Sequence, residues 1–319
     1  MREGALVLTC LACVPYLTLK ILWIFGSHVG IPDSSDLLEH EAMMRAANGL
    51  TVLMDATAVT LAFALARSWG RRIPAWLILG PMWIATGLLA PIVAAWPLQL
   101  FTGAASDSAS STGDFLEPWV FTVVYGGFGL QAAGLMTLLV LHVQQRWGRL
   151  WRGQVRELPM LPTSPATRMS VVGASVLAMY PLSVHLGWAC GADWFLTEDT
   201  DGVSAVVHAV NAGLVVLAIA GAAALAGVGR GTRVGRLDAR IPLAAAWVGS
   251  SAVGAWGLWL ILSATAFHGD TQSDTEGFSP QLVGVCGVSV VVGAMLLVSG
   301  AHLLTGWRAA RTRDLTPAT

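Results

Sequence analysis

The sequence predicts an all-α polytopic membrane protein with eight transmembrane helices, built from two parallel four-helix repeats. Composition is the first observation: 55% of the 319 residues are hydrophobic and 12% are charged, whereas soluble domains carry about 25% charged residues. The second is a series of eight apolar runs, each close to the ~20 residues that cross a bilayer. The third is a strict alternation of basic and acidic loops between these runs.

The apolar runs fall into two sets of four. We expect a first repeat at residues 1–150, a basic cytoplasmic linker at 151–167 and a second repeat at 168–319. Charged residues or prolines bound the runs, because a charge inside the hydrocarbon core is costly and proline disfavours helix continuation. The predicted spans are 5–26, 46–67, 73–96, 118–143, 168–190, 203–229, 241–267 and 280–305.

The charges in the loops predict the orientation. Sixteen of the eighteen basic residues lie in the N-terminus, three alternate loops and the C-terminal tail, and the intervening loops hold fourteen of the nineteen acidic residues. Short arginine-rich loops stay in the cytoplasm. We therefore expect a plasma-membrane protein with both termini cytoplasmic, and a retained first helix, since Lys20 interrupts its apolar run and no small-residue cleavage site follows.

The two sets of runs resemble each other. A shift of 165 residues places "PYLTLKILWIFG" over "YPLSVHLGWACG", so that Lys20 meets His185 and Trp23 meets Trp188 without a gap. With small changes of loop length, Arg45 falls on His208. Two units with an even number of helices share one topology, as in parallel repeats related by an axis along the membrane normal. The pattern predicts a duplication.

Several stretches of the first half resemble a known group of proteins. They are "PYLTLKILWIFGSHVGIPD", "NGLTVLMDATAV", "WGRRIPAWLILGPMWIATGLLAP" and "PWVFTVVYGGFGLQ". They are similar to an uncharacterised family of multi-pass membrane proteins of actinobacteria. The resemblance implies a multi-pass membrane fold and no activity.

A charged pair is predicted inside the membrane. Lys20 is the only lysine in the chain, and Asp55 is the only acidic residue within an apolar span. Helical spacing places Tyr16, Lys20, Trp23 and Ser27 on one face. Lys20 is ten residues inward from Gly30 and Asp55 is ten residues inward from Arg45, which places each about 15 Å deep. We expect the two charges to pair, because an unpaired buried charge costs several kcal/mol.

Two interpretations of this pair stay open. It either fixes helix packing or, together with His185, forms a proton-handling site, since intramembrane ionisable groups often mark pathways or active sites. For a catalytic site the candidates are Asp55, Lys20 and His185. The candidates for substrate binding are Tyr16, Trp23, Trp188, Trp83 and Glu117.

The functional hypothesis is an enzyme that acts by acid–base chemistry on a lipophilic, isoprenoid or lipid-like substrate, in the general manner of membrane terpenoid cyclases, whose motifs the sequence lacks. The alternatives are a small-molecule or proton-coupled transporter, a structural or accessory membrane protein, and a haem protein resembling haem A synthase. We expect membrane lipid and a lipophilic small molecule as partners, and neither a cofactor, a metal nor a nucleic acid, because the motifs for these are absent.

Overall fold

The computed structural model covers residues 1–319 and describes residues 1–38, 40–102, 116–158, 165–194, 204–267 and 280–313. These described residues contain eight helices that are long and apolar enough to cross a membrane, and no strand. The predicted all-α, multi-pass architecture is therefore confirmed. The chain divides into two compact units, Met1–His142 with Glu198–Val207, and Val143–Thr197 with His208–Thr319.

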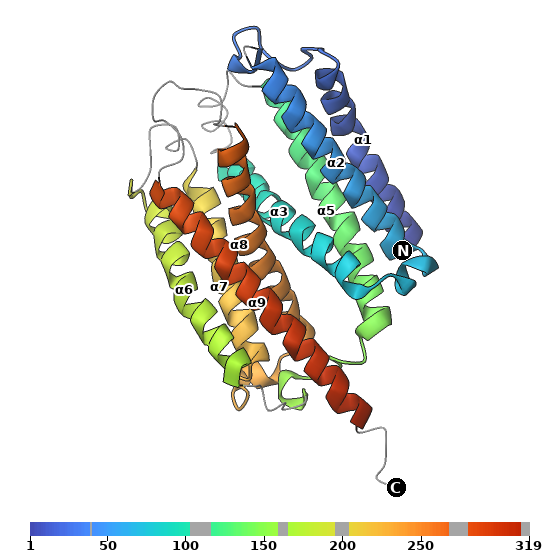
Figure 1. Ribbon diagram of the computed structural model, residues 1–319, viewed down its shortest axis with the longest axis vertical. Helices are drawn as coiled ribbons and strands as arrows, with labels where there is room; N and C mark the ends of the chain where they lie inside the picture. The colour runs from blue at the N-terminus through green and yellow to red at the C-terminus, as the bar shows by residue number, and fades with distance from the viewer. Residues whose placement is uncertain (39, 103–115, 159–164, 195–203, 268–279, 314–319) are drawn as a thin grey trace. The chain divides into compact units, whose positions relative to one another are not determined.

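The first unit is built around three neighbouring helices (Figure 1). They are α1 (Arg2–Ile24), α2 (Glu41–Ala66) and α5, whose full extent is Pro118–Trp147. The short helices η1 (Asp36–Leu38) and η2 (Ser68–Arg72) lie in the connections, and α3 (Ala75–Thr102) contains Pro81, Pro91 and Pro97.

Glycines let α1 and α5 approach closely. A Cβ atom on Gly127 would lie 2.7 Å from Cδ1 of Tyr16, and one on Gly134 would lie 2.2 Å from Oγ1 of Thr9. The two glycines are seven residues apart on α5, as the two side chains are on α1, so they share one face. The hydrophobic effect does not drive helix association inside lipid. Small residues at such an interface stabilise it instead by allowing close van der Waals packing.

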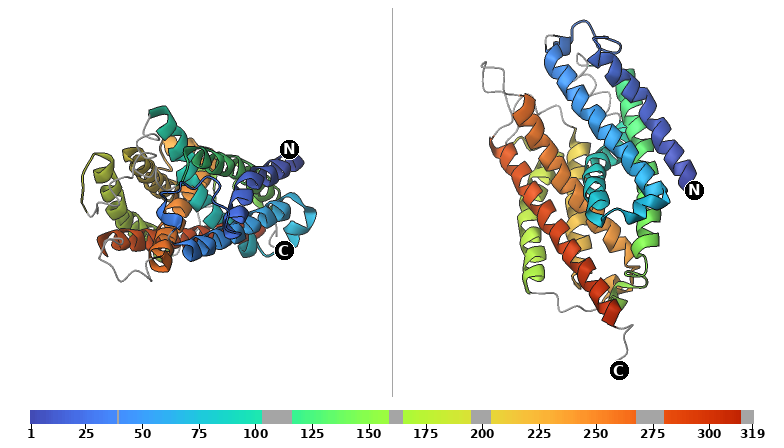
Figure 2. Two further views of the ribbon diagram at one scale, coloured as in Figure 1. Left: turned by 90° about the horizontal axis from the view of Figure 1, so that it is seen from above. Right: turned by 45° about the vertical axis from the view of Figure 1, so that its right-hand side comes forward.

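The second unit contains η3 (Val155–Glu157), α6 (Pro165–Ala189), α7 (Ala205–Leu225) from His208 onward, η5 (Arg233–Arg236), α8 (Arg240–Phe267) and α9 (Pro280–Arg313). Helices α8 and α9 run side by side (Figure 2). A Cβ atom on Gly293 of α9 would lie 2.4 Å from Cα of Gly254, and one on Gly249 would lie 2.3 Å from the backbone N of Ala218. Backbone-to-backbone approach therefore sets the spacing of α7, α8 and α9.

Helices α1 and α6 each end in a turn of the same type. Gly26 and Gly191 both have φ of 86°. In α1 the N–H of Gly26 donates to Trp23 O and the N–H of Ser27 to Leu22 O; in α6 the residues 165 positions later make the same two bonds. This is a Schellman motif, in which glycine accepts the left-handed conformation at no steric cost. The shared turn supports the predicted duplication, which stays a prediction.

Candidate functional site

The predicted charged pair is present in the first unit. Lys20 Nζ of α1 lies 2.9 Å from Asp55 Oδ2 of α2, and the two side chains are each 9% exposed. Both sit in the apolar part of a membrane-spanning helix. In low dielectric the attraction offsets the loss of hydration only if the remaining polar atoms are also bonded.

Tyr16 and Gln131 supply those further bonds. The Tyr16 hydroxyl lies 3.1 Å from Asp55 Oδ1 and 2.9 Å from Gln131 Oε1, and the two residues are 0% and 2% exposed. A phenol has one proton, so it donates to one of these oxygens at a time, and a rotated Gln131 amide would donate to the phenol oxygen. The result is a four-residue polar network, Tyr16, Lys20, Asp55 and Gln131, which joins α1, α2 and α5.

Two aromatic rings face the lysine. Lys20 Nζ lies 5.0 Å from the centroid of the Tyr16 ring and 5.7 Å from that of Phe128, and these two rings meet edge to face at 5.1 Å. Ring faces attract cations, by about 2 kcal/mol or more where water is excluded. The positive charge is therefore held by one carboxylate and two aromatic rings.

The end of α1 corrects one detail of the prediction. Helix α1 ends at Ile24, so Ser27 lies in the turn beyond it and does not continue the face that carries Tyr16, Lys20 and Trp23. The equal depth of Lys20 and Asp55 in a bilayer stays a prediction, and the 2.9 Å contact places their charged atoms at the same level.

Three of the predicted substrate-binding residues of the first unit lie on α1, on α3 and just before α5. The Trp23 indole donates to Val29 O at 2.8 Å and so fastens the turn that ends α1. Trp83 is buried on α3. Glu117 is exposed just before α5, and its backbone N–H donates to Gly30 O; it precedes Gln131 by fourteen residues, about 21 Å of helix.

The predicted residues of the second unit form a separate cluster. His185 Nδ1 lies 3.4 Å from His208 Nδ1, and their rings stack with centroids 5.6 Å apart. Trp188 contacts both rings, at 5.4 Å and 4.9 Å, and its indole donates to Trp194 O. His185 thus has a histidine where Lys20 has an aspartate. Its cooperation with Lys20 stays a prediction.

Sequence reasoning missed two members of these clusters. Gln131 carries a signal that could have been used, because an amide in the middle of an apolar span needs a partner. His208 was aligned with Arg45 at the outer end of its helix, and it does stand in the first turn of α7, which begins at Ala205, but its partner there is His185. No pattern in the sequence indicates which side chain a histidine at that place contacts.

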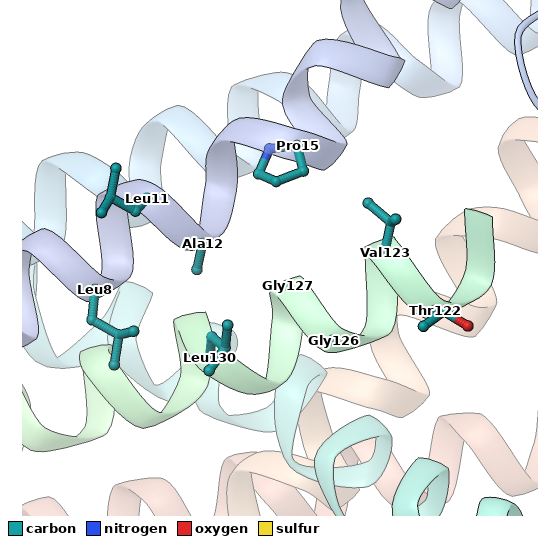
Figure 3. Close-up of a pocket in the computed structure, with 9 residues that line it drawn as sticks. All are labelled: Leu8, Leu11, Ala12, Pro15, Thr122, Val123, Gly126, Gly127 and Leu130. Carbon is teal, nitrogen blue, oxygen red and sulfur yellow. The ribbon is translucent and has the colours of Figure 1, made fainter. Parts of the chain in front are cut away.

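An apolar groove of about 320 Å³ lies between α1 and α5 (Figure 3). Gly127 lines this groove and also packs against the ring of Tyr16, a member of the polar network. The residues that line it are Leu8, Leu11, Ala12, Pro15, Thr122, Val123, Gly126, Gly127 and Leu130.

The described residues show no cluster of three or more histidine, cysteine, aspartate or glutamate side chains that could hold a metal ion. Cys13 is buried, and its thiol donates to Thr9 O at 3.2 Å within its own helix.

No family model, no curated protein and no solved structure matches the chain.

Proposed function

We propose that the protein resides in the plasma membrane with both termini in the cytoplasm and acts there on a lipophilic, isoprenoid or lipid-like substrate by acid–base chemistry. The observation that carries this proposal is the network of Tyr16, Lys20, Asp55 and Gln131, buried in the apolar spans of α1, α2 and α5. Ionisable groups at such depth are costly and mark functional sites by default. The arginine-rich loops support the orientation.

The geometry suggests a role for each member. The Asp55 carboxylate, paired with an ammonium, is the proton acceptor. The Lys20 ammonium and the Tyr16 hydroxyl are the proton donors, and Gln131 orients the phenol. The rings of Tyr16 and Phe128 would stabilise positive charge that develops on a substrate, as they do for Lys20.

The groove between α1 and α5 supports a lipophilic substrate. Its lining is almost wholly apolar, and its volume of about 320 Å³ is at the lower end of the range for ligand pockets, ~300–1,000 Å³. Pro15 has no N–H, so the Leu11 carbonyl in the groove wall loses its ordinary helical donor. That carbonyl offers one acceptor for a hydroxyl group on an otherwise hydrocarbon ligand.

A structural role is the second candidate, and a specific observation favours it. Both Asp55 oxygens have partners, Lys20 on one and Tyr16 on the other, so the network is satisfied without any ligand. Such a network locks three helices together. A transporter and a haem protein have no comparable observation among the described residues.

The double variant Lys20→Met/Asp55→Asn separates these two candidates, because it removes both charges and leaves no unpaired one. Lipid extracts of cells that express it should accumulate a lipophilic species that the wild type converts, and native mass spectrometry should detect that species bound to the variant. Glu3→Gln/Arg67→Gln, which removes an exposed ion pair of 3.1 Å, is the matched control. If the double variant folds and its lipid profile equals the wild type, the network is structural and the enzymatic proposal fails.

A further inference from the structure

A second groove lies in the other unit and has a charge at its end. It encloses about 540 Å³ between α6 and α7. The α6 residues that line it are Arg168, Val171, Val172, Ser175, Val176 and Met179, which recur every three to four residues and so form one face. From α7 and its following turn, Ile219, Ala223 and Gly227 line it at a spacing of four.

The groove is apolar except at the arginine. The one polar side chain along its length, Ser175, donates its hydroxyl to Val171 O within α6 and has no need of a ligand. Val172 and Val176 are 58% and 66% exposed, which in a bilayer means exposure to lipid. Hydrocarbon is the occupant that these walls accept.

The length of the groove matches one leaflet. Arg168 and Met179 are eleven residues apart, which is about 16 Å along a helix. The hydrocarbon core of a bilayer is about 30 Å thick, so one leaflet contributes about 15 Å. A groove that begins at an arginine and runs this far fits one acyl chain with its headgroup at the arginine.

Arg168 is available for that headgroup. It is exposed, and no ion pair or hydrogen bond of its side chain occurs within the described part of the chain. Arg230 lies two residues beyond the groove residue Val228. Its guanidinium already donates hydrogen bonds to the carbonyls of Arg156 and Leu158. Arg168 is therefore the free cation at the groove mouth, and guanidinium binds phosphate with matched geometry.

We propose that the groove between α6 and α7 binds one anionic phospholipid, with an acyl chain along Val172, Val176 and Met179 and the headgroup phosphate on Arg168. Several arginines in the neighbouring loops add a positive field that favours an anionic over a zwitterionic headgroup. This site is independent of the Lys20–Asp55 pair and of any chemistry there. The groove between α1 and α5 serves as an internal contrast, because its lining contains no charged residue.

The test compares two lipids on the purified full-length protein. Palmitoyl-oleoyl phosphatidylglycerol and palmitoyl-oleoyl phosphatidylcholine are titrated separately and the bound fraction is read by native mass spectrometry. A basic residue near a membrane surface contributes about 1 kcal/mol, or a factor of roughly five. Arg168→Gln should lower the preference for phosphatidylglycerol about fivefold, while Arg236→Gln, an exposed arginine outside the groove, should change it by less than half as much.

A second variant tests the chain-binding part. Ala223→Phe places a ring in the groove and should reduce retention of both lipids, and a photoactivatable group on the acyl chain should label α6 in the wild type but not in this variant. Thermal unfolding and size-exclusion chromatography establish that each variant is folded. Equal binding of the two lipids by the wild type, equal effects of the two arginine substitutions, or unchanged labelling of α6 in Ala223→Phe would each overturn the proposal.

Discussion

Helix α1 of the first unit and helix α6 of the second end in the same type of turn. The side chains six residues before the glycine of that turn make different interactions. Gly26 and Gly191 close α1 and α6 in the same turn, and an indole from Trp23 or Trp188 bonds the carbonyl six residues on. Six residues before each glycine, Lys20 forms an ion pair and His185 contacts another imidazole. The comparison shows that a local turn can be kept while the interaction that joins the helices changes from ionic to neutral.

The same difference extends to the neighbouring helices. In the first unit a carboxylate, Asp55, connects α2 to α1 and α5. Near the position aligned with it, the second unit has Ala218, which is 0% exposed and lies so close to α8 that Gly249 has no room for a Cβ atom. The first unit adds a polar network to its glycine contacts, whereas the corresponding position of the second unit is held by close backbone packing. Removing one charged side chain should therefore destabilise the first unit, and enlarging one glycine should destabilise the second.

Breaking the ion pair should have the largest effect. Lys20→Met or Asp55→Asn alone leaves one buried charge without its partner, at a cost of about 3–5 kcal/mol in the free energy of unfolding. The double variant should recover most of that stability. Thermal unfolding in detergent micelles measures all three, beside Arg67→Gln, whose exposed pair is worth about 1 kcal/mol or less. Two single losses that simply add in the double variant would mean that the residues do not neutralise each other.

The sequence predicted the pair but not its surroundings, for a physical reason. An ionisable side chain in an apolar span needs a counter-charge, and only Asp55 could supply one, so composition alone selected it. The eight helices followed from hydropathy in the same way. The end of α1 depends on turn geometry, which hydropathy does not record, so Ser27 was placed on a helix face although it lies in the turn. The contact of His208 with His185 was missed because the sequence does not show which side chain a histidine in a first turn meets.

A larger side chain at a closely packed glycine of the second unit should lower the free energy of unfolding. Gly293→Ala would place a Cβ atom 2.4 Å from Cα of Gly254, a backbone atom that cannot move aside, and overpacking of this kind costs about 1–3 kcal/mol. Gly300, seven residues further along α9, has nothing within 4 Å of the same position. Gly300→Ala should therefore stabilise the helix by about 0.5–1 kcal/mol. Unfolding in mixed micelles with increasing dodecyl sulfate compares the two, and equal effects would show that the α8–α9 contact does not limit packing.

Breaking the contact between His185 and His208 should have the smallest effect on the free energy of unfolding. The size of this effect tests whether the second unit contains a neutral contact where the first contains an ion pair. His208→Phe keeps a ring against Trp188 and removes the contact to His185 Nδ1. A neutral hydrogen bond contributes about 0.5–1.5 kcal/mol, so a loss of that size is expected in thermal unfolding, with His302→Phe, an exposed histidine of α9, as the control near zero. A loss as large as that of Asp55→Asn would mean that one imidazole carries a charge which the other neutral ring helps to hold. In that case both units would be built around a buried cation, and the contrast between ionic and neutral contacts would be abandoned.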